Sequence, residues 1–201
     1  MPYIEAAVRR PQFIAAARSA LAAHGVAKTS VRVVAAEAGV PLATMQYVFP
    51  SKAELLRAVI EDVVDEIAEV LAGSAEVDRG LEHAIRQGLE AFWGALVEGG
   101  RELQLLQYEL TLYALRTPGS EELARRQYQR YADVVAGWCR QAAQSAGEVT
   151  SVPFDRLARM IVAGVDGLIL QYVSDPDDAR AREAVAALAD MAIGLAGVRP
   201  R

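Results

Sequence analysis

The sequence predicts an all-α protein of about nine helices, and three observations lead to that class. Hydrophobic residues make up 53% of the chain, with many Ala and Leu and few runs of β-branched residues. Apolar positions recur every three to four residues rather than every second residue. Gly, Pro and Ser interrupt this periodicity at intervals that suit helices of ordinary length. With 201 residues, the chain has room for one large domain or two small ones.

The first two predicted helices are delimited by glycine and serine. Apolar residues on one face run from residue 4 to residue 24, and Gly25 is expected to end that helix. Ser30 is a suitable N-cap for the next helix, because its hydroxyl can accept a hydrogen bond from a free backbone N–H. That helix is expected to end before Gly39, since glycine suits the left-handed position that follows a helix.

The third predicted helix is short and the fourth is long. Residues 42–49 form the third helix, because Pro50 cannot continue it and disfavours helical geometry in the residue before it. Ser51 and Glu54 have the spacing of a capping box, which places the start of the fourth helix at Ser51. Its apolar stripe continues until Gly73 closes the helix.

Five further helices fill the rest of the chain between breaks that contain Gly or Pro. They are expected at residues 77–97, 101–116, 120–146, 154–173 and 177–196. The helix at 101–116 is apolar on most of its faces, which is typical of a central helix. The sequence has no alternating strand pattern and no internal repeat.

The second and third helices have the spacing of a helix-turn-helix. A short helix, a glycine-containing turn and a second short helix project one helix away from the rest of a domain. Five side chains are expected to face the core: Val34, Ala35, Val40, Met45 and Phe49. Four others are expected to point outward: Ala43, Thr44, Gln46 and Tyr47. Short or flat polar groups of these kinds can reach base edges and phosphates in a DNA major groove.

Basic residues are concentrated at the same end of the chain. Residues 1–52 carry six basic and two acidic side chains, a net charge of +4, whereas the remaining residues carry −9. Arg32 and Lys52 lie in the first turns of the second and fourth helices, where the helix N-terminus also favours phosphate. The sequence therefore predicts two phosphate-binding positions beside the short helix. An ordinary helical corner with a solvated face and scattered charge is the alternative.

The stretch TSVRVVAAEAGVPLATMQYVFPSKAELL, from Thr29 to Leu56, resembles the DNA-binding end of the TetR family of one-component transcriptional regulators. The matching features are A-x-x-A-G-V before the third helix, the aromatic residues Tyr47 and Phe49, and S-K-x-x-L from Ser51. This resemblance covers about residues 8–60. It implies a helix-turn-helix regulator, with repression as the default mode of action.

The resemblance also implies which residues contact operator DNA. They are Arg32, Thr44, Tyr47 and Lys52, with Ser30, Leu42, Ala43 and Gln46 as further candidates. Two positions depart from the family pattern, because Pro41 stands where a capping Ser is usual and Gln46 stands where Tyr is usual. Gln46 could donate to a phosphate or read an adenine through two hydrogen bonds.

One reading helix buries too little surface for useful specificity, about 600–1,000 Å² for a single module. Two such helices, one turn of DNA or more apart, imply a two-fold dimer on a palindromic operator. The expected dimerisation elements are the helices at 154–173 and 177–196, because the first has two adjoining apolar rows and one row can face a partner. Packing of both helices inside a single chain is the alternative.

The family resemblance further implies that a small molecule, bound among the fourth to seventh helices, releases the DNA. Aromatic walls with a few polar groups are what such a site needs. The candidate lining residues are Trp93, Gln107, Tyr108, Glu109, Tyr113, Tyr131, Trp138 and Tyr172. A largely apolar or aromatic ligand is expected, because this region offers few basic groups. The fourth helix, which begins near Lys52, is expected to shift on binding and change the spacing of the two reading helices.

The sequence argues against an enzyme, a metal site and a cofactor. His24 and His83 are the two histidines and lie far apart, so no pair of metal ligands has the usual helical spacing. There is no Gly-rich phosphate loop. Cys139 is expected to be buried packing, as lone cysteines usually are.

The expected location is the cytoplasm. A single cysteine cannot form an internal disulfide, and charged residues interrupt the apolar run that a signal peptide needs. We expect residues 1–52 to bind DNA and residues 53–201 to bind the effector and the partner subunit. The alternative function is a helical protein-interaction module without DNA binding. A steep fall of binding with salt would distinguish operator binding from that alternative.

Overall fold

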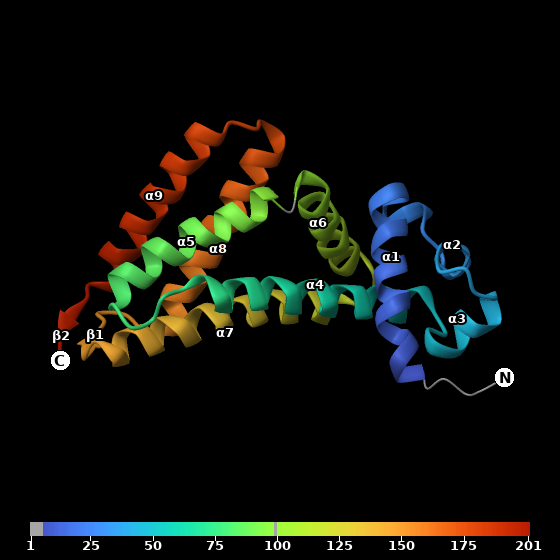
Figure 1. Cartoon of the computed structure of the whole chain (residues 1–201), viewed down its shortest axis with the longest axis horizontal. Helices are drawn as coiled ribbons and strands as arrows, with labels where there is room; N and C mark the ends of the chain where they lie inside the picture. Colours follow the sequence, from blue (N-terminus) through green and yellow to red (C-terminus); the bar gives the residue numbers. More distant parts are fainter. Residues whose placement is uncertain (1–5, 99) are drawn as a thin grey trace. The chain divides into compact units, whose positions relative to one another are not determined.

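The computed structural model describes residues 6–98 and 100–201, and these form nine α-helices and one small two-stranded sheet (Figure 1). The helices are α1 Ala6–Lys28, α2 Val31–Glu37, α3 Leu42–Val48, α4 Lys52–Ser74, α5 Leu81–Glu98, α6 Gly100–Arg116, α7 Glu121–Ser145, α8 Phe154–Ser174 and α9 Asp178–Ala196. The strands are β1 Glu148–Val149 and β2 Arg199–Pro200. The predicted all-α class is confirmed, and each predicted helix has an observed counterpart in the same order.

The chain divides into two compact units. The described residues up to Asp65, together with Leu105–Gln127, form the first unit. Glu66–Gln104 and Tyr128–Arg201 form the second unit. The first unit therefore contains the helix-turn-helix and most of α6, while the second contains α5, α8 and α9.

The first unit is built around α1, α2 and α3, which lie together at the blue end of the chain in Figure 1. Large apolar side chains from all three helices and from the start of α4 fill its core. They include Phe13, Leu21, Val34, Met45, Phe49, Leu55 and Leu56, none more than 2% exposed. Four of the five expected core residues are buried; Val40 is only partly buried, because it lies in the turn between the two helices.

The turn of the helix-turn-helix is set by local residues, as the sequence predicts. The Ser30 hydroxyl accepts a hydrogen bond from the Val33 N–H at 3.3 Å and so caps α2. Gly39 has φ +64°, the left-handed conformation that reverses the chain after α2. Pro41 precedes α3 and provides no side-chain cap, so only the Pro41 carbonyl, which accepts from Thr44 N–H at 2.9 Å, begins the helix.

The end of α1 differs from the prediction. Gly25 has φ +74° and ψ 165°, which breaks the helical conformation, but helical residues resume and continue to Lys28. The predicted end at Gly25 is therefore a kink rather than a terminus. The predicted start at residue 4 lies outside the described residues, as does Gly99 of the predicted break before α6.

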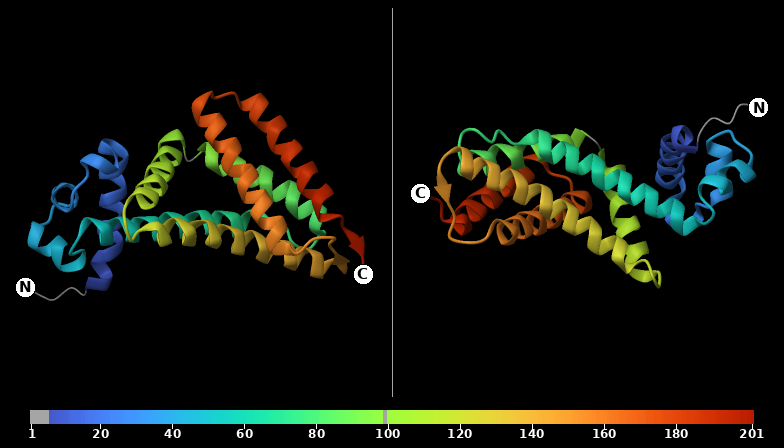
Figure 2. Two further views of the ribbon diagram at one scale, coloured as in Figure 1. Left: turned by 180° about the vertical axis from the view of Figure 1, so that it is seen from behind. Right: turned by 90° about the horizontal axis from the view of Figure 1, so that it is seen from below.

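The second unit is centred on α9, which packs against both α5 and α8. Figure 2 shows α8 and α9 as a pair of adjacent antiparallel helices, in orange and red. An added Cβ at Gly164 would overlap the Leu188 side chain, so glycine allows this close approach. Arg86 on α5 donates to Asp190 on α9 at 2.8 Å.

Two features of the second unit were not predicted. Strands β1 and β2 pair antiparallel, with Glu148 opposite Pro200, although the sequence shows no strand pattern. Helix α5 begins at Leu81 rather than at residue 77, because Gly80 adopts φ +88° and the Glu148 carboxylate accepts the Leu81 N–H at 2.8 Å. The cap of α5 therefore comes from a residue 67 positions away in the chain.

Candidate functional site

The exposed face of α3 is the first candidate site. Tyr47 is 69% exposed, and Ala43 and Gln46 are also exposed. Thr44 and Leu42 are partly buried. On the opposite face, Met45 is fully buried and anchors the helix. This seven-residue helix thus presents its polar and aromatic side chains on one side, as the helix-turn-helix prediction requires.

Two further DNA-binding candidates lie at the start of α2. Ser30 and Arg32 are both exposed, and the Ser30 hydroxyl is already engaged as the α2 cap. The N-terminal turn of a helix carries partial positive charge and free N–H groups. Arg32 is therefore placed where a phosphate could be bound by a side chain and by the helix end together.

Lys52 is placed differently from Arg32. Its ammonium is partly buried and donates to the Val26 carbonyl at 2.6 Å and, more weakly, to the Ala27 carbonyl at 3.5 Å. It also lies 6.0 Å from the centre of the Tyr113 ring. Burial lowers the pKa of Lys52 from its usual value. In this structure Lys52 therefore binds the end of α1, while its role toward phosphate stays a prediction.

Two residues expected in the effector site, Glu109 and Tyr113, lie in the first unit. The Glu109 carboxylate accepts the Val26 N–H at 2.9 Å, and Tyr113 is the aromatic neighbour of Lys52. On the same helix, Gln107 is buried and its carbonyl accepts the Thr111 hydroxyl at 2.9 Å.

The remaining α6 candidate, Tyr108, is partly buried. It lies on α6 beside Gln107, in the first unit. None of the four α6 candidates lines the pocket described below for the second unit. Their role as effector-lining groups stays a prediction.

The other four effector candidates lie in the second unit. Trp93 and Tyr172 form an edge-to-face pair with ring centres 5.6 Å apart. Tyr131 is buried and pairs with Tyr128, whose hydroxyl donates to Asp166 at 3.1 Å. Three buried polar atoms have no hydrogen-bond partner among the described residues: Trp138 Nε1, Gln104 Nε2 and Gln104 Oε1.

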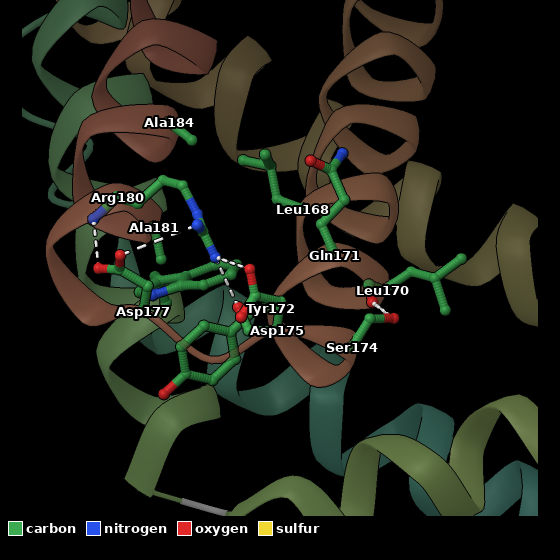
Figure 3. Close-up of a pocket in the computed structure, with 11 residues that line it drawn as sticks. Leu168, Leu170, Gln171, Tyr172, Ser174, Asp175, Asp177, Arg180, Ala181 and Ala184 are labelled. Carbon is green, nitrogen blue, oxygen red and sulfur yellow. Dashed lines mark hydrogen bonds and ion pairs between the residues drawn. The ribbon is translucent and has the colours of Figure 1, made fainter.

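A pocket of about 370 Å³ lies between α8, α9 and Trp93 of α5 (Figure 3). The apolar residues that line it are Trp93, Leu168, Leu170, Tyr172, Ala181 and Ala184. Its polar rim is made by Gln171, Ser174, Asp175, Asp177 and Arg180. The pocket unites two of the eight predicted effector residues, Trp93 and Tyr172.

The rim of this pocket is held in place by Arg180. The guanidinium donates to the Asp175 carboxylate at 2.7 Å and to the Asp175 carbonyl at 2.8 Å. Asp177 caps α9 by accepting the Arg180 N–H at 3.0 Å. The hydroxyl of Tyr172 donates to Asp178 at 2.7 Å, a bond that raises the pKa of Tyr172.

These rim residues were not among the predicted site residues. The sequence marks Ser174 to Pro176 only as the end of a helix, and the closeness of Arg180 to Asp175 follows from the turn itself. The run of aspartates before α9 could have indicated that a carboxylate caps α9 at this turn, because Asp is a preferred N-cap.

A third candidate site, after the face of α3 and the pocket, is an apolar surface on α8 and α9. Met160 and Leu170 on α8 are more than half exposed, and Met191 on α9 is 72% exposed. By length and composition, α8 could cross a membrane, and only 28% of its most apolar stretch is buried. Large exposed apolar patches usually mark an interface.

Comparison with known proteins identifies the class. The family described as "Bacterial regulatory proteins, tetR family" matches residues 13–59, and the "Tetracyclin repressor-like, C-terminal domain" matches residues 80–193. The chain belongs to the TetR family. It is therefore a transcriptional regulator with an N-terminal helix-turn-helix domain that binds DNA and a C-terminal helical domain that binds small-molecule effectors, and the family resemblance predicted from the sequence is confirmed.

Relatives of this TetR-family regulator cover nearly its whole length. It is 30% identical over 195 residues to the HTH-type nicotine-responsive transcriptional repressor HdnoR of Paenarthrobacter nicotinovorans, covering 94% of this chain and 96% of the relative. The multidrug binding protein EbrR complexed with ethidium is 28% identical, with a TM-score of 0.69, 90% of this chain and 98% of that chain covered. A transcriptional regulator from Rhodococcus sp. Rha1 has the same fold, with a TM-score of 0.74, 22% identity and coverage of 95% and 99%.

Proteins of the TetR family typically act without catalysis, as DNA-binding regulators, and dimers are typical of the family. Within the part of the chain that the structure describes, no three His, Cys, Asp or Glu side chains are grouped so as to hold a metal ion. Asp166 and Glu109, two acids in apolar helices, each accept a hydrogen bond from a residue on another helix, Tyr128 and Val26 respectively.

Proposed function

We propose that this TetR-family protein is a cytoplasmic repressor that binds a palindromic operator as a homodimer and is released by a small aromatic ligand. The observation that carries the proposal is the geometry of α3, where Met45 is buried and Tyr47 is 69% exposed on the other side. The relative HdnoR, named as a repressor, supports repression rather than activation. The chain is proposed to have no catalytic activity and to need no cofactor.

The proposed DNA contacts divide into two kinds. On α3, Thr44, Gln46 and Tyr47, with Ala43 and Leu42 beside them, reach into the major groove and read base edges. At the start of α2, Ser30 and Arg32 bind phosphate and set the register of the helix on the duplex. Lys52 is proposed as a second phosphate contact that keeps its bond to the Val26 carbonyl, since an ammonium has three donors. The proposed boundary between DNA-binding and effector-binding parts is residue 52/53.

A second copy of the chain is the proposed occupant of the apolar surface on α8 and α9. Met160, Leu170 and Met191 are exposed there. A helix with membrane-like composition and so little burial is explained if a partner's helices complete a four-helix bundle. The two-fold arrangement then supplies the two reading helices that a palindrome needs.

The pocket beside Trp93 and Tyr172 is the proposed effector site. Its aromatic wall suits a flat ring, and the Asp175 and Asp177 carboxylates at its rim suit a positively charged group. Two relatives support a basic aromatic ligand, because HdnoR is named as nicotine-responsive and EbrR was crystallised with ethidium. Gln107, Tyr108, Glu109, Tyr113, Tyr131 and Trp138 are retained as candidates for a more extended site.

Selection of bound duplexes from random DNA tests the proposed function. Purified protein should enrich a palindromic sequence, and its affinity should fall steeply as salt rises. Thr44→Ala should relax the preference at particular base pairs. Arg32→Ala should weaken binding to all sequences alike and lower the slope of log affinity against log salt concentration by about 1.

The matched control for Arg32→Ala is Arg126→Ala on α7, which removes an exposed arginine paired with Glu122. That variant should bind as the unaltered protein does. Lys52→Ala is also expected to weaken binding to all DNA sequences. It removes the bond to the Val26 carbonyl as well, so its effect combines the loss of two contacts. Failure to enrich any sequence at low salt would contradict the function and favour a protein-interaction module.

A further inference from the structure

One residue in the first unit has both its backbone N–H and its backbone carbonyl bonded to charged side chains. The Val26 N–H donates to Glu109 Oε2 at 2.9 Å, and the Val26 carbonyl accepts from Lys52 Nζ at 2.6 Å. Glu109 lies on α6 and Lys52 begins α4. We call Glu109, Val26 and Lys52 the Val26 clamp. Hydrogen bonds to charged groups are stronger than those between neutral groups.

The kink at Gly25 is what makes this clamp possible. Its φ of +74° breaks the helix one residue before Val26, and N–H groups at such a break need a partner outside the helix. A Cβ at Gly25 would lie 3.2 Å from Glu109 Oε2, so glycine also leaves room for the carboxylate. The conformation of α1 and the position of α6 are therefore linked at Val26.

A second contact ties α6 to the same place. Tyr113 lies one turn after Glu109 on α6, and its ring centre is 6.0 Å from Lys52 Nζ. Helix α6 therefore contributes to both sides of the clamp. Its Glu109 is the acceptor of the Val26 N–H, and its Tyr113 lies beside Lys52, the donor to the Val26 carbonyl. A displacement of α6 by about 1 Å would lengthen the Glu109 bond beyond hydrogen-bonding distance.

The clamp is also close in sequence to the DNA-reading residues. The buried Thr29 hydroxyl donates to the Gly25 carbonyl at 2.8 Å, and Ser30, the next residue, caps α2. Fixing Val26 therefore fixes the segment that leads into the helix-turn-helix. On the other side, Lys52 is the first residue of α4 and follows α3 closely.

We propose that the Val26 clamp holds the reading head, the helices α1 to α3, in the orientation that binds operator DNA. The inference rests on the proposed function and names Glu109 as a further residue on which operator affinity depends. Glu109 is a positioning residue in this scheme, because it acts through Val26 and not by touching DNA.

The experiment compares three variants with the unaltered protein: Glu109→Ala, which removes the acceptor; Glu109→Gln, which keeps an acceptor oxygen; and Glu121→Ala on α7, a control for loss of an exposed carboxylate in the same unit. Two quantities are measured for each. The first is the hydrogen-exchange rate of the Val26 amide by NMR, and the second is affinity for the duplex selected from random DNA.

In Glu109→Ala, the Val26 amide should exchange at least about tenfold faster, while core amides of α4 such as Val59 keep their protection. Its operator affinity should fall about tenfold, the size expected for loss of one charge-assisted bond that orients the head. Glu109→Gln should restore most of both quantities, and Glu121→Ala should match the unaltered protein.

A purely structural role for Glu109 would speed Val26 exchange but leave operator affinity unchanged, and that result would overturn the proposal. Unchanged Val26 exchange in Glu109→Ala would also overturn it, because the bond would then not protect the amide. These failures differ from failure of the proposed function, in which the unaltered protein itself selects no duplex.

Discussion

The two units of the chain differ in how completely they satisfy their own side chains. Around the reading helix of the first unit, Ser30 caps α2 and Lys52 binds two carbonyls at the end of α1. In the second unit, Gln104 and Trp138 have buried polar atoms with no hydrogen-bond partner among the described residues, and Met191 is 72% exposed. The helix-turn-helix of the first unit is therefore satisfied by its own neighbours, although α6 of the same unit also exposes Leu112 and Leu115. The second unit has a pocket and unpaired buried polar atoms that a ligand could fill, and an apolar surface on α8 and α9 that a second copy could cover.

If the helix-turn-helix is held together by its own core, truncating that core should have the largest effect on stability. Phe49→Ala removes a fully buried ring at the end of α3 and should cost about 3–5 kcal/mol. Urea denaturation measures this loss, and operator binding should be lost with it. Tyr47→Ala is the control, since that side chain is 69% exposed and its removal should leave stability nearly unchanged while weakening operator binding. Equal destabilisation by the two variants would contradict the assignment of the two faces of α3.

If the second unit depends on a partner, charges on its apolar surface should separate the subunits. Leu170→Glu combined with Met191→Glu places carboxylates where a partner's apolar groups are expected. Sedimentation should show a dimer for the unaltered protein and a monomer for this variant at micromolar concentration. Val149→Glu, also an exposed apolar residue of the second unit, is the control and should remain dimeric. A dimer unaffected by the double change would exclude α8 and α9 as the interface.

Removing one aromatic side chain from the proposed pocket should have a smaller effect, on ligand affinity. Tyr172→Ala removes one member of the aromatic pair with Trp93, and edge-to-face pairs of this kind contribute about 0.5–1.5 kcal/mol beyond their buried area. Ethidium is the probe, and its fluorescence should report binding that weakens about tenfold in the variant. Phe154→Leu, at a partly buried ring of the second unit outside the pocket, should bind as the unaltered protein does. Equal binding by all three proteins would place any ethidium site elsewhere.

The same comparison shows what the sequence could predict. Boundaries of α2, α3 and α4 are set by Ser30, Gly39 and Pro50, which act on their immediate neighbours. Capping and proline geometry are local, so a reader of the sequence can find them without knowing the fold. The exposed face of α3 follows from helical periodicity once its ends are known.

The missed features depend on residues far apart in the chain. Glu148 caps α5 from 67 positions away, and Glu109 binds Val26 across 83 positions. The sequence assigned Glu109 to the effector site because it lies in an apolar helix among aromatic residues. Only the fold shows that its carboxylate accepts the Val26 N–H beside the kink made by Gly25. Such pairings cannot be inferred from spacing, because two acceptors of equal chemistry look alike until their neighbours are known.

The smallest predicted effect concerns acid stability in the first unit. At the start of α7, hydrogen bonds from Arg125 and Arg126 lower the pKa of Glu122 to about 2 from its ordinary 4.5. Because the folded-state pKa is the lower one, this carboxylate stabilises the fold above pH 4.5, and the contribution is lost as pH falls from 4.5 toward 2. The three side chains are exposed, so solvent screens the pair and most of the benefit is absent at high salt. Thermal melts of Glu122→Gln should therefore differ from the unaltered protein only slightly at pH 7 and still less at pH 2. A larger difference at pH 2 than at pH 7 would mean that the carboxylate acts through some other contact.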